Sequence, residues 1–384
     1  MSPVGLGQNT TGAAGARIAA LDGVRGMMMI LVLISHYFAE IANGLHFLGF
    51  GWYAVQMFFI LSGFLIGRLI IERKDHVNFF SVFVMRRVCR TFPSYMISIV
   101  LIFGVLWIFR NETWTHFTAE FPLWSYLTFT QNIFMAMTGD VGAYWAAPSW
   151  TLALEEQLYI VLPLVFFLAP RRSWLRIFIA IALVALVLRT LIFTTGIVGE
   201  TWGLVMLPAR GDVLVAGVIA AVVYKERLVD LARYDLLLRL APLVMMCTCI
   251  VIALIDPSQR LFNIVGPFLI AFGFACFLLA VVRGAPEAKR FEGRFLRFMG
   301  DISYCVYLTH LMVLGLMHGL ILHAKPSLGG IDQWLVTVAA LPVAVALGWA
   351  MTTLIESPLT SYGRSWKWSD RKTGSDLAHQ GARP

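Results

Sequence analysis

Long apolar runs, separated by short polar segments, recur along almost the whole chain. A helix that spans a bilayer needs about 20 mostly apolar residues, so this pattern predicts an all-α, polytopic membrane protein with about ten transmembrane helices. The sixth window is short and the fourth carries two carboxylates. The predicted helices are 21–43, 53–71, 92–109, 149–168, 175–195, 211–224, 236–255, 261–282, 302–322 and 333–355.

Lys and Arg are distributed unevenly between alternate connecting segments. Short cytoplasmic loops of membrane proteins collect these residues. With the N-terminus inside, 25 of the 30 Lys and Arg lie in segments on the cytoplasmic side. We therefore predict that both termini are cytoplasmic and that the chain is a multi-pass protein of the cell inner (plasma) membrane. The predicted outer segments hold only Arg110, Arg210, Arg260 and Lys325.

The composition supports this class of protein and changes the meaning of the net charge. Hydrophobic residues make up 59% of the 384 residues and charged residues 14%, against about half and about a quarter in soluble domains. Because the formal charge of +8 follows from the cytoplasmic loops, we expect a lipid bilayer and no nucleic acid as partner.

We divide the chain into a flexible cytoplasmic N-terminus (1–20), a transmembrane domain (21–357) and a polar cytoplasmic tail (358–384). The aromatic spacing within 110–148 suits a helix at the membrane interface.

Two ionisable residues bracket an apolar stretch of the first predicted helix. His36 follows Arg25 by eleven residues, which places them about 20° apart around a helix and about 16 Å apart along it. We expect both to point into one cleft, with Arg25 near the cytoplasmic mouth and His36 about halfway through the membrane. Histidine suits general-base chemistry near neutral pH. The spacing equally allows a histidine bonded within the bundle and an arginine that reaches lipid phosphates.

A basic cluster, "MRRVCRTFPSY" at 85–95, precedes the third predicted helix. Arg87 and Arg90 are three residues apart and would share a helical face. Guanidinium groups bind phosphates in a bidentate fashion, so the pair is a candidate phosphate site. The same pattern is also typical of a positively charged anchor at lipid headgroups.

Carboxylates enter an apolar helix in "PSWTLALEEQLYIVLP", residues 148–163. A carboxylate near a helix N-terminus is favoured by the helix dipole, so one of the two has an ordinary explanation. Side chains of adjacent residues point about 100° apart, and we expect either Glu155 or Glu156 to face the bundle. That carboxylate would orient an imidazole or bind a sugar hydroxyl.

A polar stripe lies in "GDISYCVYLTH", residues 300–310. Ser303, Tyr307 and His310 share one helical face, and Tyr304 is offset from it. A polar stripe in a spanning helix faces protein or water, and hydrogen bonding between helices explains it equally well.

Taken together, these segments resemble acyltransferase family 3, the integral-membrane acyltransferases that O-acylate cell-surface glycans and some antibiotics. The similarity covers nearly all of residues 20–360, and its strength comes from seven motifs in the family's order. They are "ALDGVRG…ISH" with Arg25 and His36, "FFILSGFLI" (58–66), "RRVCRTFPSY" with Arg87, Arg90 and Pro93, "SWTLALEEQLY" with Trp150, Glu155 and Tyr159, "LPARGDVLVAG" (207–217), "GDISYCVYLTH" (300–310) and "IESPL" (355–359).

The resemblance implies an O-acyltransferase that moves an acetyl or other short acyl group from acyl-CoA, on the cytosolic side, to a hydroxyl of a surface polysaccharide, lipopolysaccharide or oligosaccharide precursor. Arg87 and Arg90, with Arg25, would bind the donor. Acetyl-CoA or another acyl-CoA is then a co-substrate, and we expect no tightly bound cofactor and no metal. The acceptor is a glycan or a lipid-linked glycan.

The same resemblance implies His36 as the catalytic base, supported by Arg25, Glu155 and Asp22. Either Glu155 or Asp22 would orient the imidazole, and Tyr304, Ser303 or a backbone amide would stabilise the oxyanion. No G-x-S-x-G elbow for a serine nucleophile occurs. Residues expected to contact the acceptor or the transition state are Trp150, Tyr159, Arg210, Ser303, Tyr304 and His310.

Departures from the family's motifs are Thr151, Leu158 and Gly211, none of which removes an ionisable residue. The chain ends soon after the tenth predicted helix, without the extracytoplasmic domain fused to some relatives, so any second transfer step would need a partner protein.

Two other functions use the same residues. The acceptor of an acyltransferase could be a macrolide or another small natural product. A proton-coupled secondary transporter would use His36, Arg25 and Glu155 as a proton pathway. The absence of an internal repeat and the massing of basic residues on the cytosolic side argue against the transporter. Self-association into a homo-oligomer stays open.

Overall fold

The computed structural model describes residues 18–115, 120–256 and 258–370, and within them the protein is a bundle of helices without a β-strand. Ten helical segments in this part are long and apolar enough to span a membrane, which confirms the predicted number. Most of the predicted N-terminal segment and the end of the predicted tail lie outside the described residues. The helices are α1 (Ala19–Ile34), α2 (Gly51–Arg73), α3 (Phe79–Ile108), α4 (Leu123–Leu127), α5 (Gln131–Thr138), α6 (Trp150–Leu168), α7 (Trp174–Thr195), α8 (Glu200–Val205), α9 (Leu207–Lys225), α10 (Asp235–Ile255), α11 (Arg260–Arg283), α12 (Arg294–Leu322), α13 (Ile331–Met351) and α14 (Ser357–Ser365).

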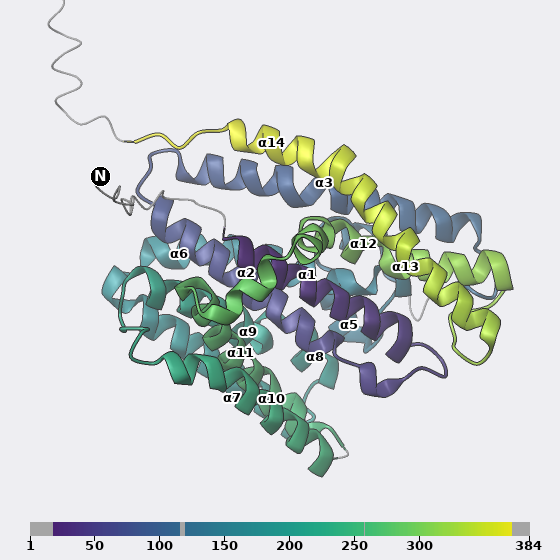
Figure 1. Ribbon diagram of the computed structural model, residues 1–384, viewed down its shortest axis with the longest axis horizontal. Coiled ribbons are helices and arrows are strands. Elements are labelled where there is room, and N and C mark those ends of the chain that lie inside the picture. Colours follow the sequence, from purple (N-terminus) through teal and green to yellow (C-terminus); the bar gives the residue numbers. More distant parts are fainter. Residues whose placement is uncertain (1–17, 116–119, 257, 371–384) are drawn as a thin grey trace, which may run out of the picture.

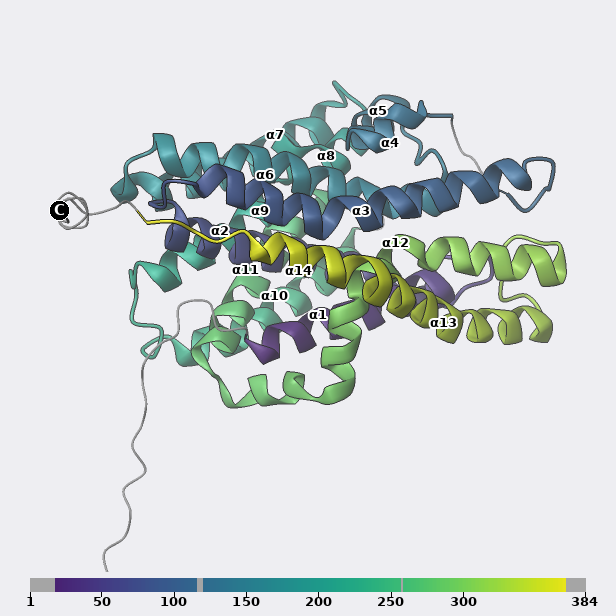
Figure 2. The same cartoon turned by 90° about the horizontal axis from the view of Figure 1, so that it is seen from above.

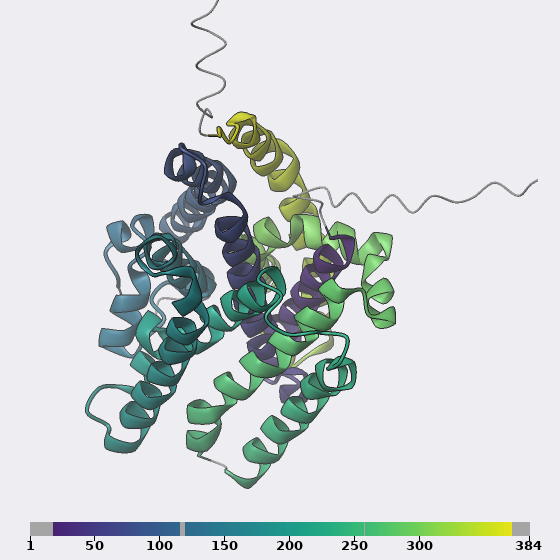
Figure 3. The ribbon, with the colours of Figure 1, turned by 90° about the vertical axis from the view of Figure 1, so that its left-hand side faces the viewer.

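The first two helices occupy the middle of the bundle. α1 packs along α12, and α2 packs along α9. Figure 1 shows α1 and α2 crossing the centre of the molecule, with α3, α13 and α14 along one edge. Figure 3 looks at the bundle from one end and shows later helices around α1 and α2. The main core therefore lies between the first two helices and their neighbours α9, α11 and α12.

Glycines allow α1 to lie directly against α12. A Cβ atom at Gly26 would overlap the carbonyl oxygen of Leu296, and one at Gly300 would overlap the carbonyl oxygen of Asp22. Helix backbones in membranes approach this closely where small residues face each other. The crossing fixes the later turns of α1 beside the middle of α12.

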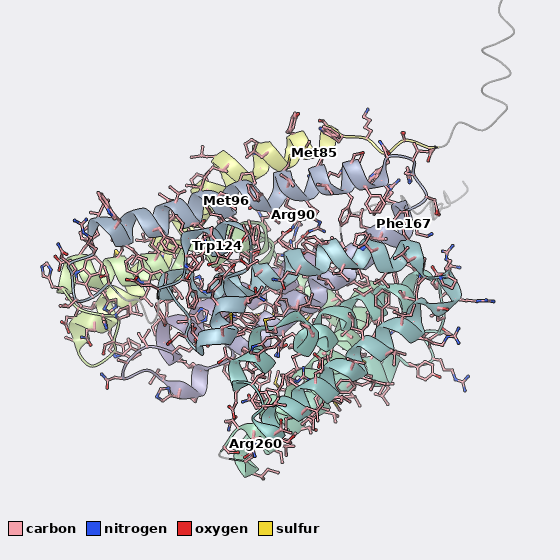
Figure 4. The ribbon with its side chains drawn as sticks, turned by 180° about the vertical axis from the view of Figure 1, so that it is seen from behind. Met85, Arg90, Met96, Trp124, Phe167 and Arg260 are labelled. Carbon is pink, nitrogen blue, oxygen red and sulfur yellow. The ribbon has the colours of Figure 1, made fainter. Side chains whose placement is uncertain are left out.

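α3 begins much earlier than predicted. We predicted a helix over 92–109, but α3 starts at Phe79, so Arg87 and Arg90 lie within the helix and not before it. Basic residues lower the mean hydropathy of this part, although a helix needs only one apolar face to pack. Figure 4 shows Arg90 midway along α3, on the side toward the body of the bundle. α12 likewise starts at Arg294 and not at residue 302.

The last span continues beyond its predicted end at residue 355. α13 passes through the π-helical segment η6 (Thr352–Glu356) into α14, which packs on α3. The first residues of the predicted polar tail are therefore helical. Figures 1 and 2 show the start of α1 and the end of α14 at the same end of the bundle, as an even number of spans requires.

The described residues of segment 110–148, in which the aromatic spacing suggests a helix, form more than one short helical element. The segment contains two short helices, α4 and α5, followed by the 3₁₀ segment η3 (Tyr144–Ser149). Trp114 and Tyr126 are buried, because they pack in a second hydrophobic cluster with α3 and α12, whereas Trp124 is exposed. The burial of Trp114 and Tyr126 against these helices is not revealed by the local pattern, whereas Leu123, Trp124 and Leu127 of α4 remain exposed.

Candidate active site

His36 lies on a widened helical turn at the end of α1. The chain passes from α1 into the π-helical segment η1 (Ser35–Ala39), a rare conformation that occurs frequently at functional sites. His36 Nδ1 lies 2.6 Å from His310 Nε2, and the two rings are nearly parallel with centroids 4.9 Å apart. His36 is thus in the last turn of its own helical segment but beside the middle of α12. The two histidines form one unit.

The hydrogen bonds around this pair select the tautomer of each ring. His310 Nδ1 lies 2.8 Å from the carbonyl oxygen of Tyr307. A carbonyl only accepts, so Nδ1 carries the hydrogen, and the Nε2 of a neutral His310 is an acceptor. His36 Nδ1–H donates to it, which leaves the lone pair of a neutral His36 on Nε2. Tyr37 supports the arrangement, because its hydroxyl donates to the backbone carbonyl of His310 at 2.8 Å.

The basic nitrogen of His36 faces Glu40, a residue that the sequence analysis did not single out. His36 Nε2 lies 3.3 Å from Glu40 Oε2, and the Ser35 hydroxyl donates to Glu40 Oε1 at 2.6 Å. Partial desolvation raises the pKa of the Glu40 carboxyl above its ordinary value, although 45% of the side chain is exposed, and the Ser35 hydrogen bond opposes this shift. The signal available in the sequence was the spacing of four residues, which places two helical side chains on one face.

Neither Glu155 nor Asp22 occupies the position expected for orienting His36. Asp22 lies fourteen residues earlier on the same helical segment, about 21 Å along the axis. Glu155 hydrogen-bonds instead to Ser62 and to the hydroxyl of Tyr159, at 3.2 and 2.9 Å. The partner of the imidazole is His310, which reaches it through the α1–α12 crossing.

Three arginines converge at a second centre. The charge of Arg90 interacts with those of Arg25 and Arg87, and all three side chains are partly exposed. Among the described residues, none of the three guanidinium groups has a hydrogen bond or an ion pair with protein, although Arg87 lies 4.5 Å from the centre of the Tyr159 ring. Like charges held together with free donors indicate a site for a multiply charged anion.

Carboxylates surround this arginine cluster without pairing with it. Glu155 and Glu156 lie on α6, and Glu356 lies on the π-helical η6. Their hydrogen bonds go to uncharged groups, including Thr91 for Glu156 and Thr352 for Glu356. The acids moderate the repulsion between the arginines at longer range and leave the guanidinium N–H groups available. Glu356 belongs to the quoted "IESPL" motif but was not predicted as a site residue.

The polar residues of α12 separate into different environments. The Ser303 hydroxyl donates to Gly300 within its own helix at 2.8 Å, and the Tyr304 hydroxyl donates to the Thr91 carbonyl near the arginine cluster at 2.7 Å. Both proposed oxyanion donors are thus engaged. Tyr307 lies between the two centres: its hydroxyl interacts with Thr151 at 3.1 Å and feels the charges of both Glu155 and Glu40.

Trp150 and Arg210 both contact Trp52, near the start of α2 and away from the arginine cluster. Trp150 stacks on Trp52, at 6.2 Å between ring centroids, and Trp52 in turn covers the Arg210 guanidinium at 4.9 Å. α2 starts beside the site, because a Cβ atom at Gly51 would contact Ser35 and Glu40. In the described part of the chain, no three His, Cys, Asp or Glu side chains are grouped to hold a metal ion.

Comparison with known proteins finds O-acetyltransferases among the similar sequences. Peptidoglycan O-acetyltransferase OatA of Listeria monocytogenes is 24% identical over 375 residues, which are 93% of this chain and 58% of that protein. O-acetyltransferase OatA of Staphylococcus aureus is 29% identical over 196 residues, which are 47% of this chain and 30% of that protein. The matched part of this chain thus spans less than two thirds of the length of each of these relatives. No solved structure matches.

A protein-family model also matches most of the chain. Residues 18–353 match the family described as "Acyltransferase domain", and they include every predicted catalytic and donor-binding residue together with His310 and Glu40. By this match, which covers nearly all of the helical bundle, the chain belongs to acyltransferase family 3.

Proposed function

We propose that this protein is a membrane O-acetyltransferase that uses acetyl-CoA to acetylate a hydroxyl of a cell-surface glycan. The observation that supports this most directly is the His36–His310 pair, which presents one basic nitrogen. The names of the matched relatives, O-acetyltransferases that include a peptidoglycan O-acetyltransferase, support a glycan as the acceptor. A macrolide-type acceptor would use the same chemistry and has no separate observation in its favour.

The donor would bind with its phosphates at the arginine cluster. Arg25 and His36 are eleven residues apart on one helical segment, about 16 Å along its axis. An extended pantetheine arm joins the phosphates of CoA to its thioester, so phosphates at the arginines leave the thioester able to approach His36. The free N–H groups of Arg25, Arg87 and Arg90 supply charge-assisted hydrogen bonds to phosphate oxygens.

The transfer step follows from the tautomer of His36. The Nε2 lone pair of His36 takes the proton of the acceptor hydroxyl, while the oxygen of that hydroxyl attacks the thioester carbonyl carbon. The carbon–sulfur bond then breaks, and the CoA thiolate takes the proton from His36. The products are an O-acetyl ester and CoA with a free thiol. His310 maintains the position of the imidazole throughout because its own Nδ1–H stays bonded to Tyr307.

Release of the CoA thiol tests this proposal. Purified wild-type protein in detergent is incubated with acetyl-CoA, with and without a membrane extract that contains acceptor glycans. We expect thiol release by the wild type and a loss of about 10²–10⁴-fold in His36→Ala, the usual contribution of a general base. A wild-type protein that neither binds nor consumes acetyl-CoA under either condition would overturn the proposal and favour the transporter.

The arginine cluster is tested separately by donor affinity. Arg87→Gln and Arg90→Gln each remove a cationic donor, so we expect KM for acetyl-CoA to rise about tenfold, and more at low salt than at high salt. Arg172→Gln is the matched control, because Arg172 is exposed in the short connection between α6 and α7. An equal rise in KM for the control would assign the effect to general surface charge.

A further inference from the structure

Arg210 is an unusual arginine, because it is completely buried and only partly hydrogen-bonded. None of its surface is exposed. One guanidinium nitrogen donates to Gln56 Oε1 at 2.6 Å, but Nε and Nη1 have no partner, and neither has the Gln56 amide nitrogen. Buried polar groups in folded proteins are almost always satisfied. The N–H groups of Arg210 Nε, Arg210 Nη1 and the Gln56 side-chain amide therefore remain without a hydrogen-bond acceptor at this position.

The charge of Arg210 also lacks a counterpart. The carboxylate two residues away, Asp212, forms a bidentate pair with Arg189 at 2.8 and 2.6 Å. Arg189 uses its remaining donors on backbone carbonyls, so this second pair is closed. Arg210 lies in the first turn of α9, where the helix dipole adds positive potential. A buried cation without an acidic partner is costly unless a ligand supplies the negative charge.

Stacked aromatic rings connect this position with the catalytic pair. Trp52 covers the guanidinium and stacks on Trp150, and both rings are partly exposed. Thr151, the next residue, bonds to the hydroxyl of Tyr307, whose carbonyl holds His310. Flat aromatic faces suit the apolar faces of sugar rings, and the free donors beneath them suit an anionic oxygen group.

We propose that Arg210, Gln56 and Trp52 form a subsite for an anionic group, a carboxylate or a phosphate, on the acceptor glycan. This inference rests on the proposed function, because it assigns the anion to the acceptor and not to the donor. The subsite lies near the beginnings of α2 and α9, whereas the arginine cluster lies toward the beginning of α1. Donor and acceptor would then bind on opposite sides of the His36–His310 pair.

Binding of small sugars without a donor tests the subsite. The wild-type protein in detergent is titrated with glucuronate, glucose 6-phosphate and glucose at constant ionic strength, and thermal stabilisation is measured. We expect one or both anionic sugars to bind about tenfold or more tightly than glucose. Preference for glucuronate assigns the subsite to a glycan carboxylate, and preference for glucose 6-phosphate assigns it to a phosphate. Because acetyl-CoA is absent, failure of acyl transfer leaves this result unaffected.

Two variants make the test independent of folding defects. Arg210→Gln removes the cation and should abolish the preference for anionic sugars. Gln56→Glu places an internal carboxylate beside the guanidinium, which completes a buried ion pair, preserves the fold and should also abolish the preference. Arg110→Gln is the control, because Arg110 is exposed in another predicted outer segment. The proposal is overturned if the wild type binds all three sugars equally, or if Gln56→Glu retains the preference.

Discussion

The basic atom of His36 is selected by a backbone carbonyl that His36 does not itself contact. Tyr307 fixes the hydrogen of His310, and His310 in turn fixes that of His36. These two hydrogen bonds join neutral groups. They can therefore form in an apolar interior, where an unpaired carboxylate would have a high desolvation cost. In the proposed mechanism His310 is therefore a positioning residue, and its role differs from that of a second base.

Substitution of His310 should reduce turnover more than donor binding. In His310→Ala, the Nδ1–H of His36 loses its acceptor, so we expect kcat to fall about 100-fold or more with little change in KM for acetyl-CoA. His310→Gln supplies an acceptor oxygen and should recover part of kcat. His318→Ala is the control, because His318 is buried on the same helix and bonds to Thr337. Equal losses in the Ala and Gln variants of His310 would contradict the positioning role.

The pH dependence of stability reports on Glu40. Because partial desolvation of the half-exposed carboxyl raises its native pKa above the ordinary 4.5, its contribution to stability is present below that value and is lost as the pH rises through the native pKa. We expect the melting temperature of the wild type, relative to that of Glu40→Gln, to fall as the pH rises from about 4 to about 8.

The matched control for Glu40 is Glu112→Gln, which changes an exposed carboxylate in a connecting segment. Melting curves of purified protein at each pH are compared between the wild type and each variant. Parallel profiles of melting temperature against pH for the wild type and Glu40→Gln would contradict the prediction, because they would show that folding does not raise the pKa of the Glu40 carboxyl.

At the scale of elements, the active site depends on how closely α1 and α12 approach. His36 and His310 are 274 residues apart in the chain, and the glycines of the crossing bring them together. Gly26→Ala introduces a methyl group where the Leu296 carbonyl lies, so the helices must separate. We expect a loss of about 1–3 kcal/mol in the free energy of unfolding, as for other overpacked sites, and a fall in kcat.

Gly104→Ala is the control for this crossing. A Cβ atom at Gly104 on α3 has nothing within 4 Å, and alanine favours a helix over glycine, so stability should stay the same or rise slightly. Unfolding in detergent and thiol release are measured for both variants. A Gly26→Ala protein as stable and active as Gly104→Ala would mean that the crossing is not tightly constrained.

The sequence predicts the helices better than it predicts their contacts. A bilayer demands a certain length and apolarity of each span, which is why hydropathy alone finds all ten. It misses the start of α3, because Arg87 and Arg90 interrupt the apolar run while their helix continues. The partner of His36 depends on a crossing between segments that are distant in the chain. The sequence therefore offered Glu155 and Asp22 as alternatives and did not indicate His310 for this role.

At the scale of the whole molecule, the two charged sites lie at different depths along the bundle, since Gln56 of the subsite and Ser62, which bonds Glu155 beside the arginine cluster, are six residues apart on α2. Arg25 is in the second turn of α1, so the arginine cluster lies nearer than the His36–His310 pair to the end of the bundle where α1 starts. Trp52 and Arg210 begin the helices α2 and α9. Orientation in the membrane therefore decides which site acetyl-CoA, a cytosolic metabolite, is able to reach.

Thiol labelling in intact cells tests the predicted orientation. Val198→Cys lies in the connection between α7 and α8, and Ser369→Cys follows α14, and both positions are exposed. With both termini in the cytoplasm, a membrane-impermeant maleimide should label Val198→Cys from outside, and Ser369→Cys only after permeabilisation. The wild type, whose described cysteines lie within helices, gives the background. The reverse pattern would direct the arginine cluster away from the cytosol, and acetyl-CoA could then no longer be the donor, however well His36 is placed as a base.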